Sequence, residues 1–458
     1  MKKYLLHFLL LLSVSTLALV SCNNSPATAP RPAGDTARVN GHPAWIMQGN
    51  IYEVNLRQYT PEGTIKAFEA SLPRLKEMGV QTLWFMPINP ISKADRKGSL
   101  GSYYAVSDYM QVNPEFGTMD DWKSLVSKCH DNGMKVIIDW VPNHTGADHY
   151  WLQKHPAFYV TDSAGHPVSQ FDWTDTRKLN YHNPELQDSM IRCMKFWIDT
   201  TGIDGFRCDY AVGPTREFWS RCISDLKKDK NIFMLAEADS AWLYKAGFDA
   251  TYGWNDFSMM KLIAKGKRKA SDFDSAVAKT DTAYPANAIR LFFTSNHDEN
   301  SWNHADYETM PGLSHAPFAV LTQTMKKGIP LIYSGQEEPI LRAIRFFDKD
   351  TITFSKYQRA DFYHKLLLLR KTHPALAVDG GFERVKTDKD GSVYAYFRVT
   401  DKDRVFVILN LSGKKQSVKL LGTSFTSEYM KDEFSGMSIH AFPTSYELEP
   451  WGYRVLTF

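Results

Sequence analysis

Four short apolar segments of the chain each end in polar side chains that could perform acid–base chemistry. These ends are Asp139–His144, Gly205–Asp209, Phe233–Glu237 and Asn296–Asp298. If each apolar segment is a parallel strand, its carboxyl end delivers these side chains to one common face. A single polar residue at a strand end is usually a helix cap or a solvated loop residue. Four such ends, which together carry carboxylates, histidines and an arginine, instead favour an active site.

Two of the carboxylates, Asp209 and Glu237, have neighbours that suit different chemical roles. Side chains two residues apart in a strand share a face, so Arg207 points the same way as Asp209. An adjacent arginine lowers the pKa of a carboxyl group and keeps it ionised, as a nucleophile requires. Glu237 ends an apolar strand, where partial burial would raise its pKa towards that of a working acid. One ionised and one protonated carboxyl group form the kind of pair that glycoside hydrolysis uses, but the sequence does not give the separation that decides between retention and inversion.

The elements that position these residues are short apolar strands alternating with amphipathic helices, from about Trp45 to Thr372. One helix is expected to begin with a variant capping box formed by Thr118 and Asp121. Eight strand–helix units predict an α/β fold, a (β/α)8 TIM barrel. A doubly wound open sheet is the alternative, but no glycine-rich phosphate loop follows the first strand. The predicted strands are Ile51–Asn55, Gln81–Met86, Lys135–Val141, Gly205–Asp209, Ile232–Glu237, Phe248–Tyr252, Ile289–Asn296 and Ile329–Tyr333.

The barrel pattern is interrupted once and is later replaced by a different pattern. The catalytic barrel is predicted over residues 41–146 and 186–372. Between these parts, residues 147–185 are rich in His, Asp, Trp and Pro, and we interpret them as a short excursion domain after the third strand. Residues 373–458 alternate in the manner of strands and predict a C-terminal all-β sandwich domain. Its expected strands are Ser392–Val399, Arg404–Asn410, Gln416–Leu421 and Tyr453–Phe458.

The N-terminus carries a targeting signal. A short basic region and an apolar run predict a secretory signal peptide over residues 1–21. The segment Leu19–Cys22 resembles a bacterial lipobox, so we expect lipidation of Cys22; a plain signal peptide with an incidental cysteine is the alternative. Residues 22–40, rich in Pro, Ala, Ser and Thr, predict a flexible tether. The expected location is the cell envelope, as a lipoprotein that is periplasmic or anchored at the outer membrane or surface.

Composition excludes several classes of partner and cofactor. The formal net charge of the 458 residues is only +3, which argues against a nucleic-acid surface. After the signal peptide no stretch is apolar and long enough to span a bilayer, so membrane contact is expected only through the lipid anchor. The remaining cysteines form no Cys-x-x-Cys pair, which argues against a zinc or redox site and favours buried free thiols.

On these motifs the chain resembles the α-amylase family, glycoside hydrolase family 13, over essentially all of the mature protein. The four segment ends resemble the family's four signature regions, in the same order along the chain. The resemblance implies that Asp209 is the nucleophile, Glu237 the general acid/base and Asp298 a third essential carboxylate. Weaker matches are Gly79–Pro87 and Gly328–Glu337, around the second and eighth strands. The sugar contacts that the resemblance implies are Tyr104, His144, Arg207 and His297.

The chain departs from the family's pattern at two places. Many α-amylases carry Lys-His three and four residues after the nucleophile, where they hold sugar on the leaving-group side, but Val212 and Gly213 stand here. This departure puts endo-acting α-amylase specificity in question. Asn143 matches one ligand of the calcium ion often found beside the excursion domain, although the shortened excursion weakens the rest of the site. No cofactor is expected for the chemistry, and a structural calcium ion is left open.

The expected function is hydrolysis of α-1,4-glucosidic bonds in starch-like glucans or maltooligosaccharides. Within the family, the alternatives are a cyclomaltodextrinase or neopullulanase-like enzyme, an α-glucosidase and a transglycosylase. Lys178–Asn180 resembles a short excursion-domain motif and leans towards the neopullulanase-like group. An inactive glucan-binding lipoprotein is the alternative from another class, and it predicts loss of at least one of the three carboxylates. A structural envelope protein would leave the clustered strand-end residues unexplained. Oligomeric state is left open.

Overall fold

The computed structural model describes residues 36–304, 310–422 and 429–458. The predicted signal peptide, the lipidation site Cys22 and most of the predicted tether lie outside these residues. The first described strand, β1 (Arg38–Val39), pairs antiparallel with β2 (His42–Pro43), which leads into the 3-10 turn η1 (Ala44–Ile46). The last residues of the segment expected to be a tether therefore already pair with the chain beyond it. None of the described helices combines the length and the apolar character that crossing a membrane requires.

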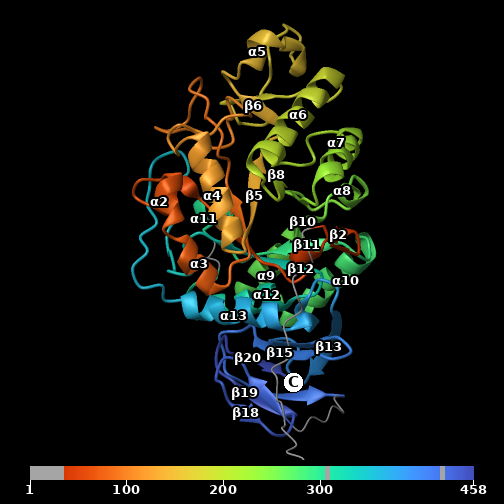
Figure 1. Cartoon of the computed structure of the whole chain (residues 1–458). Helices are drawn as coiled ribbons and strands as arrows, with labels where there is room; N and C mark the ends of the chain where they lie inside the picture. The colour runs from red at the N-terminus through yellow and green to blue at the C-terminus, as the bar shows by residue number, and fades with distance from the viewer. Residues whose placement is uncertain (1–35, 305–309, 423–428) are drawn as a thin grey trace, which may run out of the picture. The chain divides into compact units, whose positions relative to one another are not determined.

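Eight parallel strands close into a barrel, which confirms the predicted architecture (Figure 1). Each strand pairs with the next one in barrel order, and the last returns to the first through Leu331 and Ile51. Nearly every strand residue is buried, because side chains fill the interior and helices cover the outside. The barrel strands are β3 (Ile51–Val54), β4 (Thr82–Phe85), β5 (Lys135–Trp140), β8 (Gly205–Cys208), β9 (Phe233–Ala236), β10 (Ala250–Tyr252), β11 (Ile289–Phe292) and β12 (Gly328–Tyr333).

Capping interactions and a left-handed glycine set the ends of the barrel helices described next. The helix after β4 begins with the predicted capping box, in which Thr118 and Asp121 each accept a backbone N–H of the other. The long helix before β8 ends at Gly202, whose φ of 73° lies in the left-handed region that glycine adopts freely. The helices of the barrel are α1 (Leu56–Tyr59), α2 (Ile65–Glu69), α3 (Leu72–Met78), α4 (Met119–Asp131), α6 (Pro184–Thr201), α7 (Arg216–Asp229), α8 (Trp242–Lys245), α9 (Trp254–Ala264), η3 (Ala270–Asp272), α10 (Phe273–Ala283), α11 (His297–Ser301), η4 (Gly312–Ser314), α12 (His315–Thr324) and α13 (Ala360–Thr372).

The excursion after the third barrel strand is a small irregular unit. Its β6 (His144–Gly146) pairs antiparallel with β7 (Thr176–Lys178), and α5 (Trp151–Lys154) and η2 (Pro156–Phe158) lie between them. Gly146 lets this hairpin approach the loop after β4, because a Cβ there would lie 2.4 Å from Ser92 Cβ. The excursion is therefore packed against a loop of the barrel.

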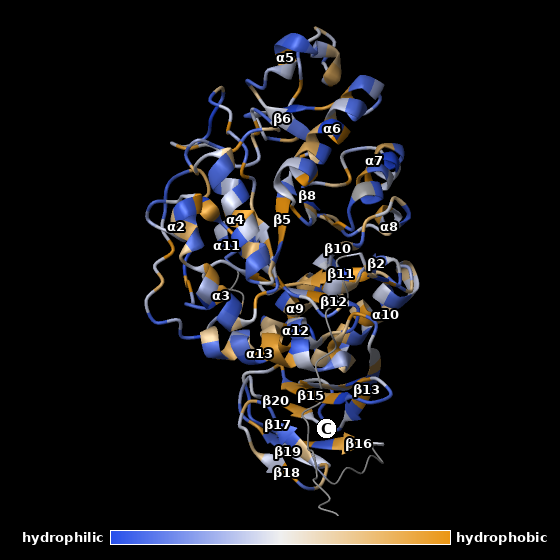
Figure 2. Cartoon of the chain, viewed as in Figure 1, coloured by the Kyte–Doolittle hydropathy of each residue, from blue (hydrophilic) through white to orange (hydrophobic). Residues whose placement is uncertain are grey.

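The C-terminal residues form an antiparallel sheet, in agreement with the predicted all-β domain. Its eight strands run in the order β18-β17-β20-β15-β14-β13-β16-β19. Phe406 of the central part and Tyr446 of the edge strand β19 have ring centroids 5.8 Å apart, so the sheet closes over its own apolar core. Figure 2 shows the hydrophobic colouring of β15 and β20 in this domain and of β5 and β12 in the barrel. The elements are η5 (Pro374–Leu376), β13 (Gly381–Thr387), β14 (Val393–Val399), β15 (Arg404–Asn410), β16 (Gln416–Leu421), β17 (Met430–Asp432), β18 (Ser438–Ile439), β19 (Ser445–Leu448) and β20 (Tyr453–Thr457).

Two buried arginines lie where the amino ends of the barrel strands meet the C-terminal sheet. Arg370 of α13 donates to the carbonyl oxygens of Gly49 at 2.8 Å and Gly328 at 2.7 Å, where β3 and β12 begin. Arg398 of β14 donates to the carbonyl of Thr324, at the end of α12, at 2.7 Å. These contacts satisfy backbone carbonyl groups that would otherwise be buried without partners.

The four cysteines of the described chain are buried and unpaired, as predicted. They are Cys129, Cys193, Cys208 and Cys222. Burial raises the pKa of each thiol above its ordinary value, so none is an activated thiolate. They serve as small apolar side chains in the core.

Candidate active site

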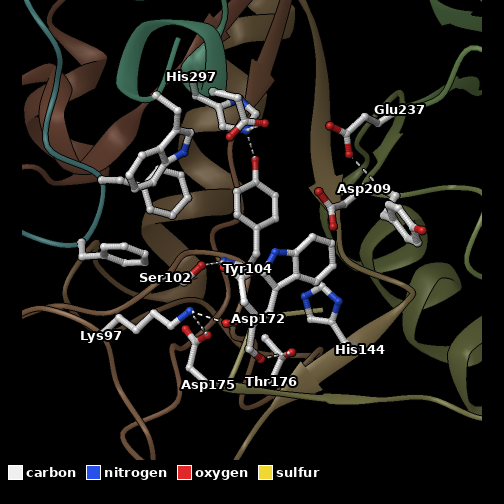
Figure 3. Close-up of a pocket in the computed structure, with 16 residues that line it drawn as sticks. Lys97, Ser102, Tyr104, His144, Asp172, Asp175, Thr176, Asp209, Glu237 and His297 are labelled. Atoms are coloured by element: carbon white, nitrogen blue, oxygen red, sulfur yellow. Dashed lines mark hydrogen bonds and ion pairs between the residues drawn. The ribbon is translucent and has the colours of Figure 1, made fainter. Parts of the chain in front are cut away.

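A cavity of about 510 Å³ lies at the carboxyl ends of the barrel strands. Six of the seven predicted catalytic and sugar-contact residues line it (Figure 3). The seventh, Arg207, is fully buried and contacts two of them, Asp209 and Glu237. The six come from separate loops and strand ends, so only the closed barrel brings them together. The residues that line the cavity are Lys97, Ser102, Tyr104, His144, Asp172, Trp173, Asp175, Thr176, Asp209, Tyr210, Glu237, His297, Asp298, Trp302, Phe346 and Phe347.

Arg207 organises the floor of the site. Its Nη1 donates to Asp139 Oδ1 at 2.9 Å and to Asp209 Oδ1 at 3.0 Å. Its Nη2 forms an ion pair with Glu237 Oε1 at 3.0 Å. Because the guanidinium is planar and rigid, it holds these carboxylates at fixed positions around one plane. Its Nε donates to Tyr252 Oη at 3.1 Å, which fixes the orientation of the guanidinium itself.

The two central carboxyl groups, Asp209 and Glu237, both have pKa values above their ordinary range. Burial raises the pKa of Asp209 to about 6, while Arg207 opposes this rise. The sequence predicts a lowered pKa for Asp209; this prediction is wrong in sign, because desolvation outweighs the arginine. Burial also raises the pKa of Glu237 to about 7, and the charge of Asp209 adds to the rise. The raised pKa lets Glu237 hold a proton close to neutral pH, as a general acid requires.

The backbone after Asp209 holds Glu237 in place. The N–H of Tyr210 donates to Glu237 Oε2 at 2.8 Å. Tyr210 adopts a φ of 40°, in the left-handed region that costs free energy for any residue other than glycine. The turn is thus held in a strained conformation that points an N–H at the carboxylate. The charge of Asp209 acts on Glu237, and both side chains contact the Arg207 guanidinium, so their carboxyl groups lie close together.

Asp298 lies at the start of α11, beside a histidine that is held by two carboxylates. His297 Nδ1 lies 2.5 Å from Glu53 Oε1, and its Nε2 lies 3.3 Å from Asp298 Oδ2. Burial disfavours the imidazolium ion, but Asp298 and Glu53 outweigh this effect and raise the pKa of His297 well above its ordinary value. The charged His297 in turn lowers the pKa of Asp298 against the effect of burial. Asp298 is therefore ionised under conditions where Glu237 is still protonated.

Tyr104 forms one wall of the cavity and ties the two halves of the site together. Its hydroxyl lies 2.8 Å from His297 Nε2 and 3.2 Å from Asp139 Oδ2. Its ring stacks on His297, with centroids 5.5 Å apart, and lies parallel to Phe346 at 6.2 Å. A flat aromatic face at this position can support the apolar face of a sugar ring. The resemblance implies that role for Tyr104.

The sequence assigned no role to two residues of the site, although Asp139 stands in a predicted strand-end motif. Asp139, which stands in the first strand-end motif, bridges Arg207 and Tyr104 at the centre of the network. Glu53 lies in β3, fully buried, with its second carboxylate oxygen lacking a hydrogen-bond partner among the described residues. A lone carboxylate inside the apolar run Ile51–Val54 was the signal that could have identified Glu53.

The segment after Asp209 explains one departure from the family's pattern. A Cβ on Gly213 would lie 2.0 Å from Asn143 Oδ1, so no larger residue fits there without a shift of the chain. Val212 is 39% exposed and presents an apolar side chain. The contact that lysine and histidine would provide is therefore absent at these positions. Nothing in the geometry of Val212 supplies a replacement hydrogen bond.

The surroundings of Asn143 do not fit a carboxylate-rich calcium site. Its Oδ1 faces Gly213, and its Nδ2 lies 3.2 Å from His144 Nδ1. Calcium prefers six to eight oxygen ligands, usually with several carboxylates. Within residues 36–304, 310–422 and 429–458, no three His, Cys, Asp or Glu side chains gather in a way that could hold a metal ion.

Comparison with known proteins places this geometry in a family context. The family described as "Alpha amylase, catalytic domain" matches residues 34–173 and 168–358, and "Alpha-amylase SusG C-terminal domain" matches residues 393–442. Alpha-amylase 2 of Dictyoglomus thermophilum is 27% identical, over 90% of this chain and 76% of that protein. Neopullulanase 2 of Thermoactinomyces vulgaris is 29% identical, over 82% and 67% respectively. Among solved structures, a maltogenic alpha-amylase, AmyB of Thermotoga neapolitana, superposes with a TM-score of 0.83 at 26% identity, covering 90% of this chain and 99% of that one.

Proposed function

Because the chain belongs to the α-amylase family and is a glycosidase, we propose that it cleaves α-1,4-glucosidic bonds in starch-like glucans or maltooligosaccharides with retention of configuration. One observation carries the proposal: a single buried guanidinium, that of Arg207, holds Asp209 and Glu237 side by side at the cavity floor. Retaining glycosidases need two carboxyl groups close together, whereas inverting enzymes leave room for a water molecule between them.

The geometry supports distinct roles for the carboxylates. Asp209, held by Arg207 at 3.0 Å, attacks the anomeric carbon and forms a covalent glycosyl ester. Glu237, with a pKa of about 7, first gives its proton to the leaving glycosidic oxygen and then takes one from the incoming water. Asp298, kept ionised by His297, accepts hydrogen bonds from sugar hydroxyl groups as positive charge develops on the ring. These steps use side chains of the chain alone.

The roles can be tested with neutral isosteres. Asp209→Asn and Glu237→Gln should each lower kcat/KM on soluble starch by about a thousandfold or more, because the two groups act as one unit. Asp225→Asn, which removes a surface carboxylate of α7, is the matched control and should retain activity. With α-maltosyl fluoride, whose leaving group needs no proton, Glu237→Gln should regain glycosyl transfer to Asp209, while Asp209→Asn should not. Full starch activity in either isostere would overturn the role assignment.

Activity on different glucans distinguishes an α-amylase from the second candidate function. The neopullulanase relative favours a cyclomaltodextrinase or neopullulanase-like activity as the second candidate. Activity on pullulan and cyclodextrins above that on amylose would select it, and the reverse would select an α-amylase. An inactive glucan-binding protein predicts no product from any α-glucan; the presence of Asp209, Glu237 and Asp298 in one cavity argues against it.

We further propose that the protein is exported and anchored to the cell envelope through a lipid on Cys22. Support comes from the signal-peptide pattern and the lipobox-like Leu19–Cys22. Growth of the producing cells with radioactive palmitate should label the full chain but not a Cys22→Ser variant. Equal labelling of both would contradict the anchor, and release of the wild-type protein into solution would favour a plain signal peptide.

A further inference from the structure

A second cluster of charged and hydrogen-bonding side chains lies behind the catalytic acid, on the helix-covered side of the barrel wall. Tyr252 points into the barrel, where its hydroxyl contacts the guanidinium at the floor of the site, so its neighbour Thr251 points outward. Arg290 of β11 donates from Nη1 to Thr251 Oγ1 and from Nη2 to Asp239 Oδ1 at 2.5 Å. Asp239 follows Glu237 by two residues, and the proposed mechanism uses neither Asp239 nor Arg290.

Glu237 stands in a turn rather than in a strand, so the chain on both sides of it decides where its side chain points. The N–H of Ala238 donates to the carbonyl of Ala236 at 3.0 Å, which is the hydrogen bond of a γ-turn with Glu237 at its centre. Before the turn, the pairing of β9 with β8 fixes the backbone. Beyond the turn, the N–H of Tyr252 donates to the carbonyl of Ala238 at 3.0 Å. The next residue is Asp239, whose side chain can fix the exit of the turn.

Three separate elements donate hydrogen bonds to the Asp239 carboxylate. Besides Arg290, the backbone N–H of Asn255 in the first turn of α9 donates to its Oδ2 at 2.9 Å, and the hydroxyl of Tyr284, after α10, donates to its Oδ1. Burial alone would raise the pKa of Asp239, but Arg290 and Tyr284 outweigh burial and lower it. Asp239 is therefore a charged group that ties the turn carrying Glu237 to β11, α9 and the end of α10.

Arg290 has a second, more distant carboxyl partner. Asp256 Oδ2 lies 3.8 Å from Arg290 Nη2, beyond hydrogen-bond distance, and has no hydrogen-bond partner among the described residues. Burial raises the pKa of Asp256 to about 7, and the charge of Asp239 adds to the rise. Removal of Asp239 would lower the pKa of Asp256 and leave this carboxylate beside Arg290. Replacement of Asp239 therefore leaves the buried arginine with an anionic neighbour, so we expect the fold to persist.

We propose that Asp239, held by Arg290, positions Glu237 for proton transfer to the leaving oxygen and from the attacking water. The inference rests on the proposed function and deepens it, because it names positioning residues outside the cavity. Arg290 is fully buried, and neither residue lines the cavity, so both act through the backbone of the turn. A general acid must lie within hydrogen-bond distance of the oxygen that it protonates, and a misplacement of about 1 Å can cost about a hundredfold in rate.

Two substrates that differ in their need for an acid test this role. The leaving sugar of maltotetraose must be protonated, whereas α-maltosyl fluoride releases fluoride without a proton. Asp239→Ala should lower kcat/KM for maltotetraose about a hundredfold and kcat/KM for the fluoride less than about fivefold. Glu237→Gln should change the two values in the same direction. Asp239→Asn, whose amide oxygen can still accept from Arg290 and Tyr284, should lose less activity on maltotetraose than Asp239→Ala.

The chain offers a matched control for the loss of such a carboxylate. Asp274 Oδ1 accepts from Arg384 Nε at 3.0 Å and from the Tyr394 hydroxyl at 2.8 Å, which are the same kinds of donor that Asp239 binds. These partners belong to the C-terminal sheet, away from the turn after β9. Asp274→Ala should therefore leave the ratio of the two kcat/KM values within about twofold.

Azide provides a second readout that a merely structural role would not change. The azide anion attacks the anomeric carbon of the glycosyl ester, the bond to Asp209 breaks and leaves a carboxylate, and no proton moves. Water, by contrast, needs Glu237 as a base. Added azide should raise kcat of Asp239→Ala on α-maltosyl fluoride and yield maltosyl azide, whereas kcat of the wild type should not rise.

The outcomes separate the inference from the proposed function. If the wild type cleaves both substrates but Asp239→Ala loses activity on them equally, or loses none, the positioning role is wrong and the glycosidase mechanism stands. If the wild type acts on neither substrate, the proposed function fails, and the inference with it. Thermal unfolding identifies a folding defect; should Asp239→Ala fail to fold, the same ratio measured for Asp239→Asn decides, and a value within twofold of wild type overturns the inference.

Discussion

The two ends of the barrel both bury arginines, but in opposite electrostatic surroundings. At the carboxyl ends of the strands, Arg207 contacts three carboxylates; burial would lower the pKa of its guanidinium, yet these charges raise it well above its ordinary value. At the amino ends, the hydrogen bonds of Arg370 and Arg398 go to backbone carbonyl groups. Burial lowers the pKa of both guanidinium groups there.

The partners of a buried arginine therefore decide whether its charge serves the chemistry or the fold. Backbone carbonyl groups cannot change their charge, so Arg370 and Arg398 only satisfy fixed dipoles and hold the C-terminal sheet against the barrel. Carboxylates gain and lose protons, so Arg207 tunes groups whose charge changes during a reaction. In a barrel of this type, function lies at the carboxyl ends of the strands and stability at the amino ends.

Replacement of Arg207 gives the largest expected effect and tests its chemical role. Arg207→Gln leaves Asp139, Asp209 and Glu237 without their shared cation. The pKa values of Asp209 and Glu237 should then rise further, and their side chains are no longer held in place by the guanidinium. We expect kcat/KM on soluble starch to fall by about a thousandfold. Far-ultraviolet circular dichroism checks that the fold persists. A variant that keeps more than about a tenth of wild-type activity would contradict an electrostatic role.

Replacement of Arg370 should instead affect stability and leave the chemistry intact. Arg370→Met removes the donors to five buried carbonyl groups, and we expect the free energy of unfolding to fall by about 3–5 kcal/mol in urea titrations. Arg268→Met, on an exposed loop, is the control and should change the free energy of unfolding by less than about 0.5 kcal/mol. A lower kcat for Arg370→Met together with an unchanged urea unfolding curve would contradict the assignment of Arg370 to stability.

Replacement of Glu53 should have the smallest effect, and it tests how His297 is kept charged at the active-site end of the barrel. Glu53→Gln removes one of the two carboxylates that keep His297 charged, so the pKa of His297 should fall. The carboxylates that act on His297 or feel its charge are Glu53, Asp298 and Asp139, and the Tyr104 hydroxyl lies 2.8 Å from its Nε2. Once His297 becomes neutral, Asp298 loses its cation. We expect kcat/KM to fall about tenfold at pH 7 but less at pH 5.5, so the alkaline limb of the pH profile moves to lower pH. A uniform loss at every pH would indicate a merely structural role for Glu53.

Much of the fold could be predicted from local sequence patterns. All eight barrel strands were predicted, because each is an apolar run bounded by turn residues and long enough to be buried. In the C-terminal domain, β14, β15, β16 and β20 were predicted, whereas β13, β17, β18 and β19 were missed. The strand β13 (Gly381–Thr387) begins at the second of two adjacent glycines and has two charged residues in a row, Glu383 and Arg384, so only its pairing with β14 and β16 identifies it as a strand.

The sequence by itself determined the chemical types at the strand ends: which carboxylates, histidines and arginine the chain supplies, and in what order. Only the tertiary structure decided how they interact. Burial in the closed barrel outweighs Arg207 and raises the pKa of Asp209, a sum of opposing effects that spacing along the chain cannot predict. Glu53 joins the site because β12 closes onto β3, which brings its carboxylate to His297, 244 residues further along the chain. Tyr210 likewise contacts Phe171 and Trp173 only because the excursion folds back over the end of β8.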